Sequence, residues 1–224
     1  MQAGRRRIGK MLKALVILSL GFASQGLPAP PPEHSWKTEI DNSLVRVERR
    51  QIEPHERVPA AETPPALLVF LTDYSVRLTN AKEELQGKPG QFLWHPGGRI
   101  GVENLSGHPV EVARVTPKFS PASEAAPAVL NSRNVLFDND LIHVRHVHFA
   151  RGGKTAMHPV MPRVLIRLSA AHIKFTWADG RVEEIQMKAG DIHFVPEGAF
   201  SDENLGDSLE ALRIELKAGK RDDR

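Results

Sequence analysis

Three histidines in the second half of the chain have a spacing that could build a metal site. His146 and His148 lie two residues apart in an alternating run, so they share one face of a strand. They are in phase with the apolar residues Ile142 and Val144, which predicts that both imidazoles point toward the core. If His158 lies on a neighbouring strand, the three side chains could bind one divalent metal and leave a position open for substrate. The sequence favours the alternative that they are ordinary hydrogen-bonded or partly exposed histidines.

Several other kinds of catalytic chemistry are excluded by the residue types. The chain has no cysteine, which excludes disulfide scaffolds, thiolate metal sites and cysteine nucleophiles. It contains no G-x-S-x-G, P-loop or dinucleotide-binding motif. With 41% hydrophobic and 25% charged residues, its composition is that of a globular protein. Any chemistry must therefore depend on histidine, carboxylate and amide groups.

The N-terminal segment is expected to lie outside the folded part. Residues 1–23 contain no acidic residue. Five basic residues precede a short apolar run at 14–23, which is the order of a secretory signal peptide. The run is about half the roughly 20 residues that a membrane-spanning helix needs, so we expect no permanent membrane anchor. Residues 24–35 form a proline-rich leader. The sequence therefore predicts a periplasmic or secreted protein.

Removal of residues 1–23 changes the charge balance of the protein. The whole chain has 30 Lys and Arg residues against 27 Asp and Glu residues. Without the five basic residues of that segment, 25 basic residues stand against 27 acidic ones, a net charge of −2. Because no basic stripe with interleaved aromatic residues is present, the sequence predicts no nucleic-acid partner. A monomer and a homodimer both stay open.

From Trp36 onward, short apolar or alternating runs are separated by turn residues. The runs 44–47, 67–71 and 164–168 are typical of strands, and the dipeptide at 179–180, Asp-Gly, is typical of a hairpin turn. No apolar pattern of helical period lasts more than a turn or two. The sequence therefore predicts an all-β fold.

The chain also repeats itself at a spacing of about 100 residues. The segment 41–47, DNSLVRV, returns as 138–144, DNDLIHV, and the E-N-L of 103–105 returns at 203–205. An acid and an asparagine at one recurring point are expected to fix a strand turn through backbone hydrogen bonds, a structural role. The repeat predicts two copies of one β domain.

Each copy resembles a domain of the cupin superfamily. In the second copy the resemblance rests on Gly152, His158, the strand at 164–168, the segment GDIHFVPEG at 190–198 and the E-N-L at 203–205. It implies a bicupin, with two tandem jelly-roll barrels. The predicted domains are an N-terminal cupin-like barrel at 36–116, a linker at 117–131, a C-terminal cupin-like barrel at 132–217 and a charged tail at 218–224.

Cupins that perform chemistry usually hold a divalent metal through an H-x-H pair, a following acid and a later histidine. The first copy departs from this pattern. Its H-x-H positions are Ala61 and Thr63, and its later histidine position is Ile100 or Gly101, depending on which residue anchors the match. No imidazole is left at these positions.

The second copy departs from the pattern as well. His158 matches the first ligand, but Val160 takes the place of the second, and Phe200 or Ser201 that of the last. Because apolar side chains do not bind metal, the resemblance implies that the standard metal site is absent from both barrels.

Three further polar residues are candidates for lining a ligand pocket. His193 lies in a predicted strand where the first copy has Leu93. Arg49 and Gln51 take the positions in the first copy that His146 and His148 take in the second. Neither Arg49 nor Gln51 is a typical metal ligand, which favours ordinary structural roles for the two histidines as well.

The sequence therefore predicts a secreted cupin-domain protein that has lost the standard metal site, needs no cofactor, and acts as a small-molecule binding or structural module. The alternative is a cupin-type metalloenzyme, an oxygenase or isomerase, in which His146, His148 and His158 hold Fe, Mn, Ni or Zn. The sequence leaves open whether the protein is an enzyme.

Overall fold

The computed structural model describes residues 35–79, 84–120 and 135–218, and all of them belong to one compact unit, Glu33–Arg224. The predicted signal peptide, and nearly all of the predicted leader and linker, lie outside the described residues. Within the described ranges, no helix is long and apolar enough to cross a membrane. The structure there consists of antiparallel strands, which confirms the all-β prediction.

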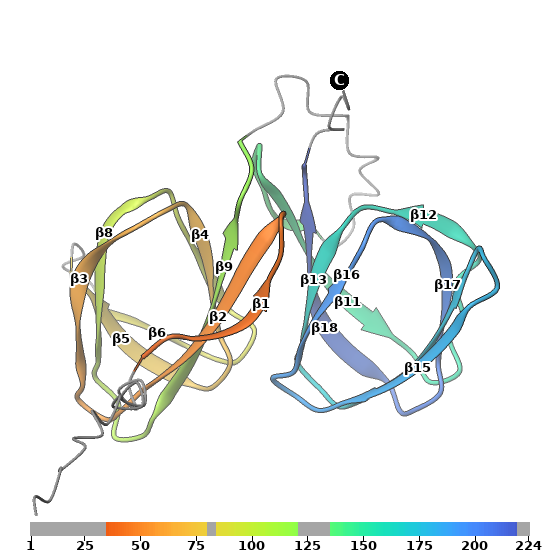
Figure 1. Cartoon of the computed structure of the whole chain (residues 1–224). Coiled ribbons are helices and arrows are strands. Elements are labelled where there is room, and N and C mark those ends of the chain that lie inside the picture. Colours follow the sequence, from red (N-terminus) through yellow and green to blue (C-terminus); the bar gives the residue numbers. More distant parts are fainter. Residues whose placement is uncertain (1–34, 80–83, 121–134, 219–224) are drawn as a thin grey trace, which may run out of the picture. The chain divides into compact units, whose positions relative to one another are not determined.

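The first barrel closes from two antiparallel sheets (Figure 1). A five-stranded sheet has the order β1-β2-β9-β4-β7, and a four-stranded sheet has the order β3-β8-β5-β6. The strands are β1 (Lys37–Asp41), β2 (Val45–Ile52), β3 (Arg57–Thr63), β4 (Ala66–Phe70), β5 (Tyr74–Leu78), β6 (Glu84–Gly87), β7 (Phe92–His95), β8 (Gly98–Asn104) and β9 (Val110–Pro117).

The second barrel repeats this topology strand for strand. Its five-stranded sheet has the order β10-β11-β18-β13-β16, and its four-stranded sheet the order β12-β17-β14-β15. The strands are β10 (Val135–Asp138), β11 (Ile142–Phe149), β12 (His158–Val160), β13 (Arg163–Arg167), β14 (Ala171–Trp177), β15 (Val182–Met187), β16 (Ile192–Val195), β17 (Gly198–Asn204) and β18 (Leu209–Leu216).

The repeated D-N motif explains why both barrels begin with the same hairpin. The Oδ1 atom of Asn42 accepts hydrogen bonds from the backbone N–H groups two and three residues later, at 2.8 and 2.9 Å. Asn139 does the same in the second barrel, at 2.9 and 2.8 Å. In each barrel the asparagine side chain satisfies these N–H groups within the turn itself. The turns between β1 and β2 and between β10 and β11 are therefore stabilised by local hydrogen bonds.

The five-stranded sheets are buried on both faces. In β4, Leu68 and Phe70 pack into the interior of the first barrel, whereas Leu67 and Val69 pack on the opposite face. That opposite face belongs to a shared core, a single apolar cluster to which both five-stranded sheets contribute. Its fully buried members are Val45, Val47, Leu67, Val69, Ala113 and Val115 from the first barrel, and Ile142, Val144, Val164, Ile166, Leu212, Ile214 and Leu216 from the second.

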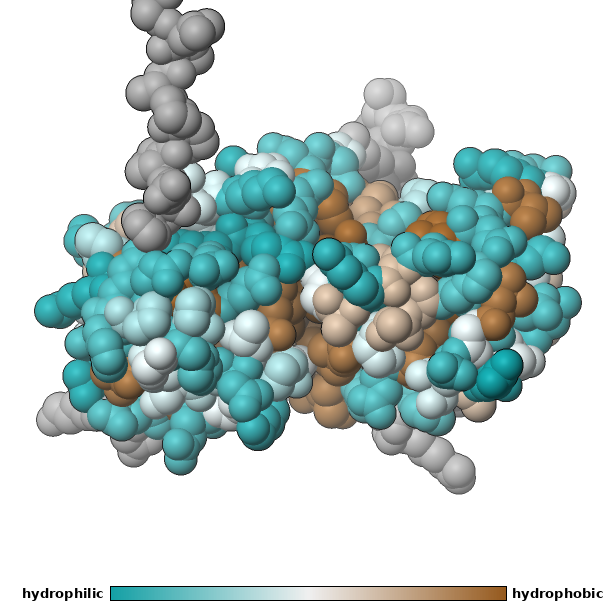
Figure 2. Space-filling model, turned by 90° about the horizontal axis from the view of Figure 1, so that it is seen from below, coloured by the Kyte–Doolittle hydropathy of each residue, from teal (hydrophilic) through white to brown (hydrophobic). Residues whose placement is uncertain are grey.

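The outer faces of the four-stranded sheets carry polar side chains instead. In β14 (Ala171–Trp177), for example, the polar residues His172, Lys174 and Thr176 alternate with buried apolar residues. Most of the surface in Figure 2 is accordingly hydrophilic, with hydrophobic residues between the hydrophilic ones. Chemistry inside the barrels must therefore come from the residues that alternate inward.

Candidate binding cavities

His146 and His148 lie on β11, on the same face as Ile142 and Val144, as the alternation predicts. That face belongs to the shared core and not to the interior of the second barrel. Near the end of β11 it opens to solvent: His148 is exposed, and the Nε2 atom of His146 lies 3.5 Å from a carboxylate oxygen of Glu210. The expectation that both imidazoles point into the core is corrected here.

His158 begins β12, where it pairs with Phe200 of β17. Its Nδ1 atom lies 2.9 Å from the carbonyl oxygen of Ala156, and its ring centroid is 5.9 Å from that of Phe200. The structure thus does not bring His158 together with His146 and His148. In the part of the chain that the structure describes, no three histidine or carboxylate side chains form a group that could hold a metal ion.

In the first barrel, the register of β3 and β8 decides which residues take the ligand positions of enzymatic cupins. Ala61 pairs with Ile100, and Thr63 pairs with Gly98. A Cβ atom at Gly101 would lie 2.8 Å from backbone atoms of β3, so no larger side chain fits there. Ile100 therefore takes the later position. Alanine, threonine and isoleucine are not a ligand set for a divalent metal, so a cupin metal does not fit this barrel.

A cavity opens where these residues meet. It has about 610 Å³ of space not filled by atoms, part of which is continuous with solvent. Ala61, Thr63 and Ile100 all line it. The other walls are mostly apolar and include Ile52, Val58, Leu68, Phe70, Leu78 and Val112.

One guanidinium group, that of Arg114, lines the same cavity. Its Nε and Nη2 atoms both donate to one carboxylate oxygen of Glu48, at 3.0 and 2.6 Å. The guanidinium group lies over the ring of Trp36, with the guanidinium carbon 4.1 Å from the ring centroid. Because the charge of Arg114 is already matched by that of Glu48, the first cavity offers no free charge to a ligand.

The second barrel fills the corresponding place with an aromatic cluster. Because Phe200 pairs with His158, it is Phe200 and not Ser201 that takes the last ligand position. Phe200 is fully buried. Its ring centroid lies 5.3 Å from that of Phe175 and 5.0 Å from that of Trp177. His158 alone, beside an apolar ring, does not make a site for the family's metal.

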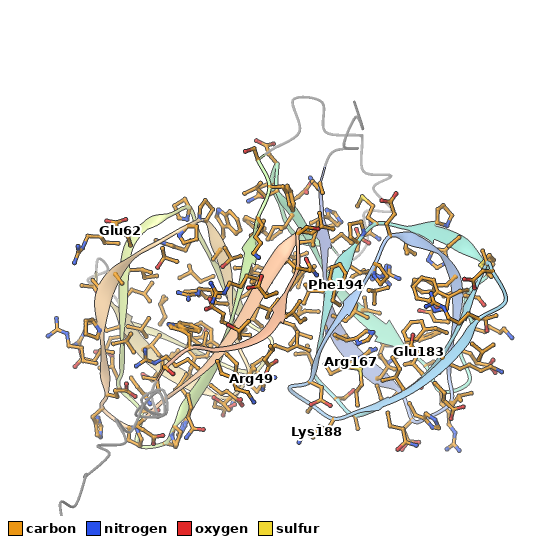
Figure 3. All side chains as sticks on the ribbon, viewed as in Figure 1. Arg49, Glu62, Arg167, Glu183, Lys188 and Phe194 are labelled. Carbon is orange, nitrogen blue, oxygen red and sulfur yellow. The ribbon has the colours of Figure 1, made fainter. Side chains whose placement is uncertain are left out.

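Beyond this cluster, the second barrel contains a smaller and more polar cavity, with about 370 Å³ of space not filled by atoms, part of which is continuous with solvent. Three arginines line it: Arg163 and Arg167 at the two ends of β13, and Arg213 on β18. Arg163 and Arg167 are only 3% and 4% exposed, and Arg167 points into the barrel (Figure 3). Sequence reasoning missed these residues.

His193 lies on β16 opposite Leu165, and so faces the interior of the second barrel. Burial lowers the pKa of its imidazole below the ordinary value of 6.5. The negative charge of Glu183 opposes this shift, and the positive charge of Arg167 adds to it. His193 is therefore a neutral group at pH 7, available as a hydrogen-bond donor or acceptor.

Arg49 and Gln51 do not line a barrel interior, which corrects the expectation that they line a pocket. Both share the face of β2 that carries Val45 and Val47 into the shared core. Arg49 is held by two glutamates, Glu39 and Glu111, and donates to a backbone oxygen of the second barrel, Gly190 O, at 2.6 Å. Gln51 is exposed and donates to Glu53 at 2.8 Å.

Comparison with solved structures finds the same architecture. A salicylate 1,2-dioxygenase from Pseudaminobacter salicylatoxidans is similar over 82% of this chain and 77% of its own, with a TM-score of 0.60 at 11% identity. A cupin 2 conserved barrel domain protein from Leptotrichia buccalis is similar over 85% of this chain and 92% of its own, with a TM-score of 0.58 at 12% identity. The coconut allergen cocosin gives 0.55 at 12% identity, over 79% and 77%.

No protein-family model matches the sequence, and no curated protein does either. The likeness to the solved structures, at 11 to 12% identity, concerns the fold. Together with the repeated strand order, it assigns the chain to the cupin fold, in the two-barrel form of bicupins.

Proposed function

We propose that the protein binds a small molecule in its first barrel, at the place where enzymatic cupins hold their metal, and does not act as a metalloenzyme. One observation carries this proposal. The three side chains at the ligand positions, Ala61, Thr63 and Ile100, do not make a ligand set for a divalent metal, but all three line one largely apolar cavity.

The walls of this cavity favour an uncharged, largely apolar ligand. Aliphatic and aromatic side chains make up most of its lining, so an apolar molecule gains free energy by leaving water for it. A charged ligand would lose its hydration without gaining a free partner, because Arg114 is already paired with Glu48. The ligand class is therefore a neutral apolar molecule.

A neutral fluorescent probe, N-phenyl-1-naphthylamine, tests this proposal. We expect its fluorescence to rise and saturate when the purified protein is added, because an apolar cavity excludes water from the dye. Ala61→Phe places a ring in the cavity and should weaken binding about tenfold or more, a loss of about 1.4 kcal/mol.

Glu62→Phe is the matched control. Glu62 is the next residue of β3, is exposed, and points away from the first barrel (Figure 3), so the same ring there leaves the cavity open. Probe affinity in this variant should equal that of the unchanged protein. The proposal fails if the probe does not saturate, or if Ala61→Phe binds it as tightly as Glu62→Phe does.

We further propose that binding takes place outside the cytoplasm. The order of basic and apolar residues in 1–23 supports export, and a chain without cysteine folds independently of the redox state of its compartment. A ligand-binding protein of this kind would meet its ligand in the periplasm or the medium.

A further inference from the structure

The interior of the second barrel contains more positive charge than it can pair. Arg163, Arg167 and Arg213 line its cavity, and the carboxylates that act on them are those of Asp202 and Glu215. Three guanidinium groups thus face two carboxylates. A buried charge without a partner is costly, because the protein interior replaces its hydration poorly.

The partners of each guanidinium show where the excess lies. Arg213 lies 3.6 Å from Glu215, so this pair is formed. Among the described residues, no carboxylate oxygen comes within 4.0 Å of Arg163 or Arg167. Asp202 is engaged by the hydroxyl of Thr155, which donates to its carboxylate. Because the charge of Asp202 still acts on both other arginines, one excess positive charge is shared by Arg163 and Arg167.

Arg163 and Arg167 are instead held by weak partners. The guanidinium of Arg163 lies over the ring of Phe200, 4.9 Å from its centroid, and its Nε atom is buried without a hydrogen-bond partner. The Nε atom of Arg167 donates to the sulfur of Met187 at 3.3 Å, a poor acceptor. Both side chains are fixed in place with donor groups left over, which is the arrangement of a preformed anion site.

We propose that this cavity binds a small monocarboxylate, with its carboxylate recognised by Arg163 and Arg167. The planar fork of a guanidinium matches the two oxygens of a carboxylate. Apart from the arginines and Asp202, the lining is apolar, including Val147, Leu165 and Phe175, and suits a short hydrocarbon body better than a second negative charge.

Two further observations agree with this assignment. Burial and the charge of Arg213 lower the pKa of Arg163 to about 10, and a bound anion would oppose this shift. In the first barrel, Ala66 and Phe70 take the places of Arg163 and Arg167 in β4, so the anion site belongs to the second barrel alone.

Butyrate and its neutral analogue butyramide test the proposal at pH 7 by NMR titration of the purified protein. We expect saturable binding of butyrate and at least about tenfold weaker binding of butyramide, since only butyrate carries the charge. Arg163→Met and Arg167→Met should each weaken butyrate binding by about the same factor. Arg167→Lys keeps the charge but loses the fork, and should also bind more weakly.

Arg151→Met is the matched control, because Arg151 is an exposed guanidinium of the same barrel. It should bind butyrate as the unchanged protein does. The proposal is overturned if butyramide binds as well as butyrate, if both buried-arginine variants retain full affinity while folded, or if inorganic phosphate binds more tightly than butyrate. Ala61→Phe should leave butyrate binding unchanged, so the first-barrel and second-barrel proposals fail separately.

Discussion

Asn104 and Asn204 make equivalent hydrogen bonds in the two barrels. Both are fully buried at the ends of β8 and β17, and each Nδ2 atom donates to three backbone carbonyl oxygens. The acceptors are Ile52, Glu53 and His108 for Asn104, at 2.9 to 3.0 Å, and Phe149, Ala150 and Asp207 for Asn204, at 2.7 to 3.1 Å. The prediction that this recurring asparagine fixes a turn through backbone hydrogen bonds is confirmed.

The stability of the second barrel should therefore depend on Asn204. Asn204→Ala leaves buried carbonyl groups without a donor, and we expect a loss of about 2 to 4 kcal/mol in the free energy of unfolding. Urea unfolding followed by circular dichroism measures it. Gln51→Ala, at an exposed position, should change stability by less than about 0.5 kcal/mol. Equal stability of the two variants would contradict the role given to Asn204.

The free energy of unfolding should depend on pH in part through the titration of His193. Because burial lowers its pKa in the folded protein, the unfolded chain binds a proton first as the pH falls below 6.5. The free energy of unfolding should therefore fall from pH 7 toward pH 5. His193→Leu, which installs the residue of the first barrel, should flatten this slope, whereas Gln51→Ala, which removes no titratable group, should not. An unchanged slope in His193→Leu would refute the assignment.

The metal content of the purified protein tests the metalloenzyme alternative. We expect Fe, Mn, Ni and Zn far below one atom per chain by elemental analysis, because His158 is the only common metal ligand among the ligand positions of the two barrels. His158→Ala should leave the metal content unchanged. One metal per chain that is lost in His158→Ala would instead establish a metal site at His158.

Export is tested by expression in a Gram-negative host. We expect the protein outside the cytoplasm, without residues 1–23, because that segment has the order of a cleaved signal peptide. Fractionation and mass spectrometry of the N-terminus measure this. A chain lacking residues 2–23 should stay in the cytosol. Intact protein found only in the cytosol would refute export.

Limited proteolysis should cut first in the predicted linker at 117–131 or in the leader at 24–35, because exposed connections are preferred sites of cleavage. After a cut in the linker we expect the two halves to co-elute in size-exclusion chromatography, since both contribute to one shared core. Separation of the halves in native buffer would show that the shared core does not hold them together.

The alternation of residues predicted which side chains share a face, but not which face is the barrel interior. His146 and His148 do lie with Ile142 and Val144. In a sheet with only one apolar face, sharing a face with apolar residues would show that the two histidines point into the barrel. Here both faces of the five-stranded sheet are buried, so the apolar residues mark the shared core as readily as the interior, and the sequence alone does not distinguish the two.

The arginine site was missed for a related reason. Arg163 and Arg167 bracket the run 164–166 and look like the polar ends of a buried strand. Both are buried because β13 lies between β16 and β18 in the sheet and its two ends face the barrel interior, which the sequence does not reveal. The sequence did contain one signal: the first copy has Ala66 and Phe70 at these places, so the two interiors differ in charge.

The shared core also restricts how the gene can be rearranged. A single barrel, expressed or fused elsewhere, would present a sheet face of valine, leucine and isoleucine to water. Insertions and domain swaps that keep one half must therefore supply a new cover for that face. Because each half covers the apolar sheet face of the other, the two barrel interiors can differ in their lining and charge while the shared core stays intact.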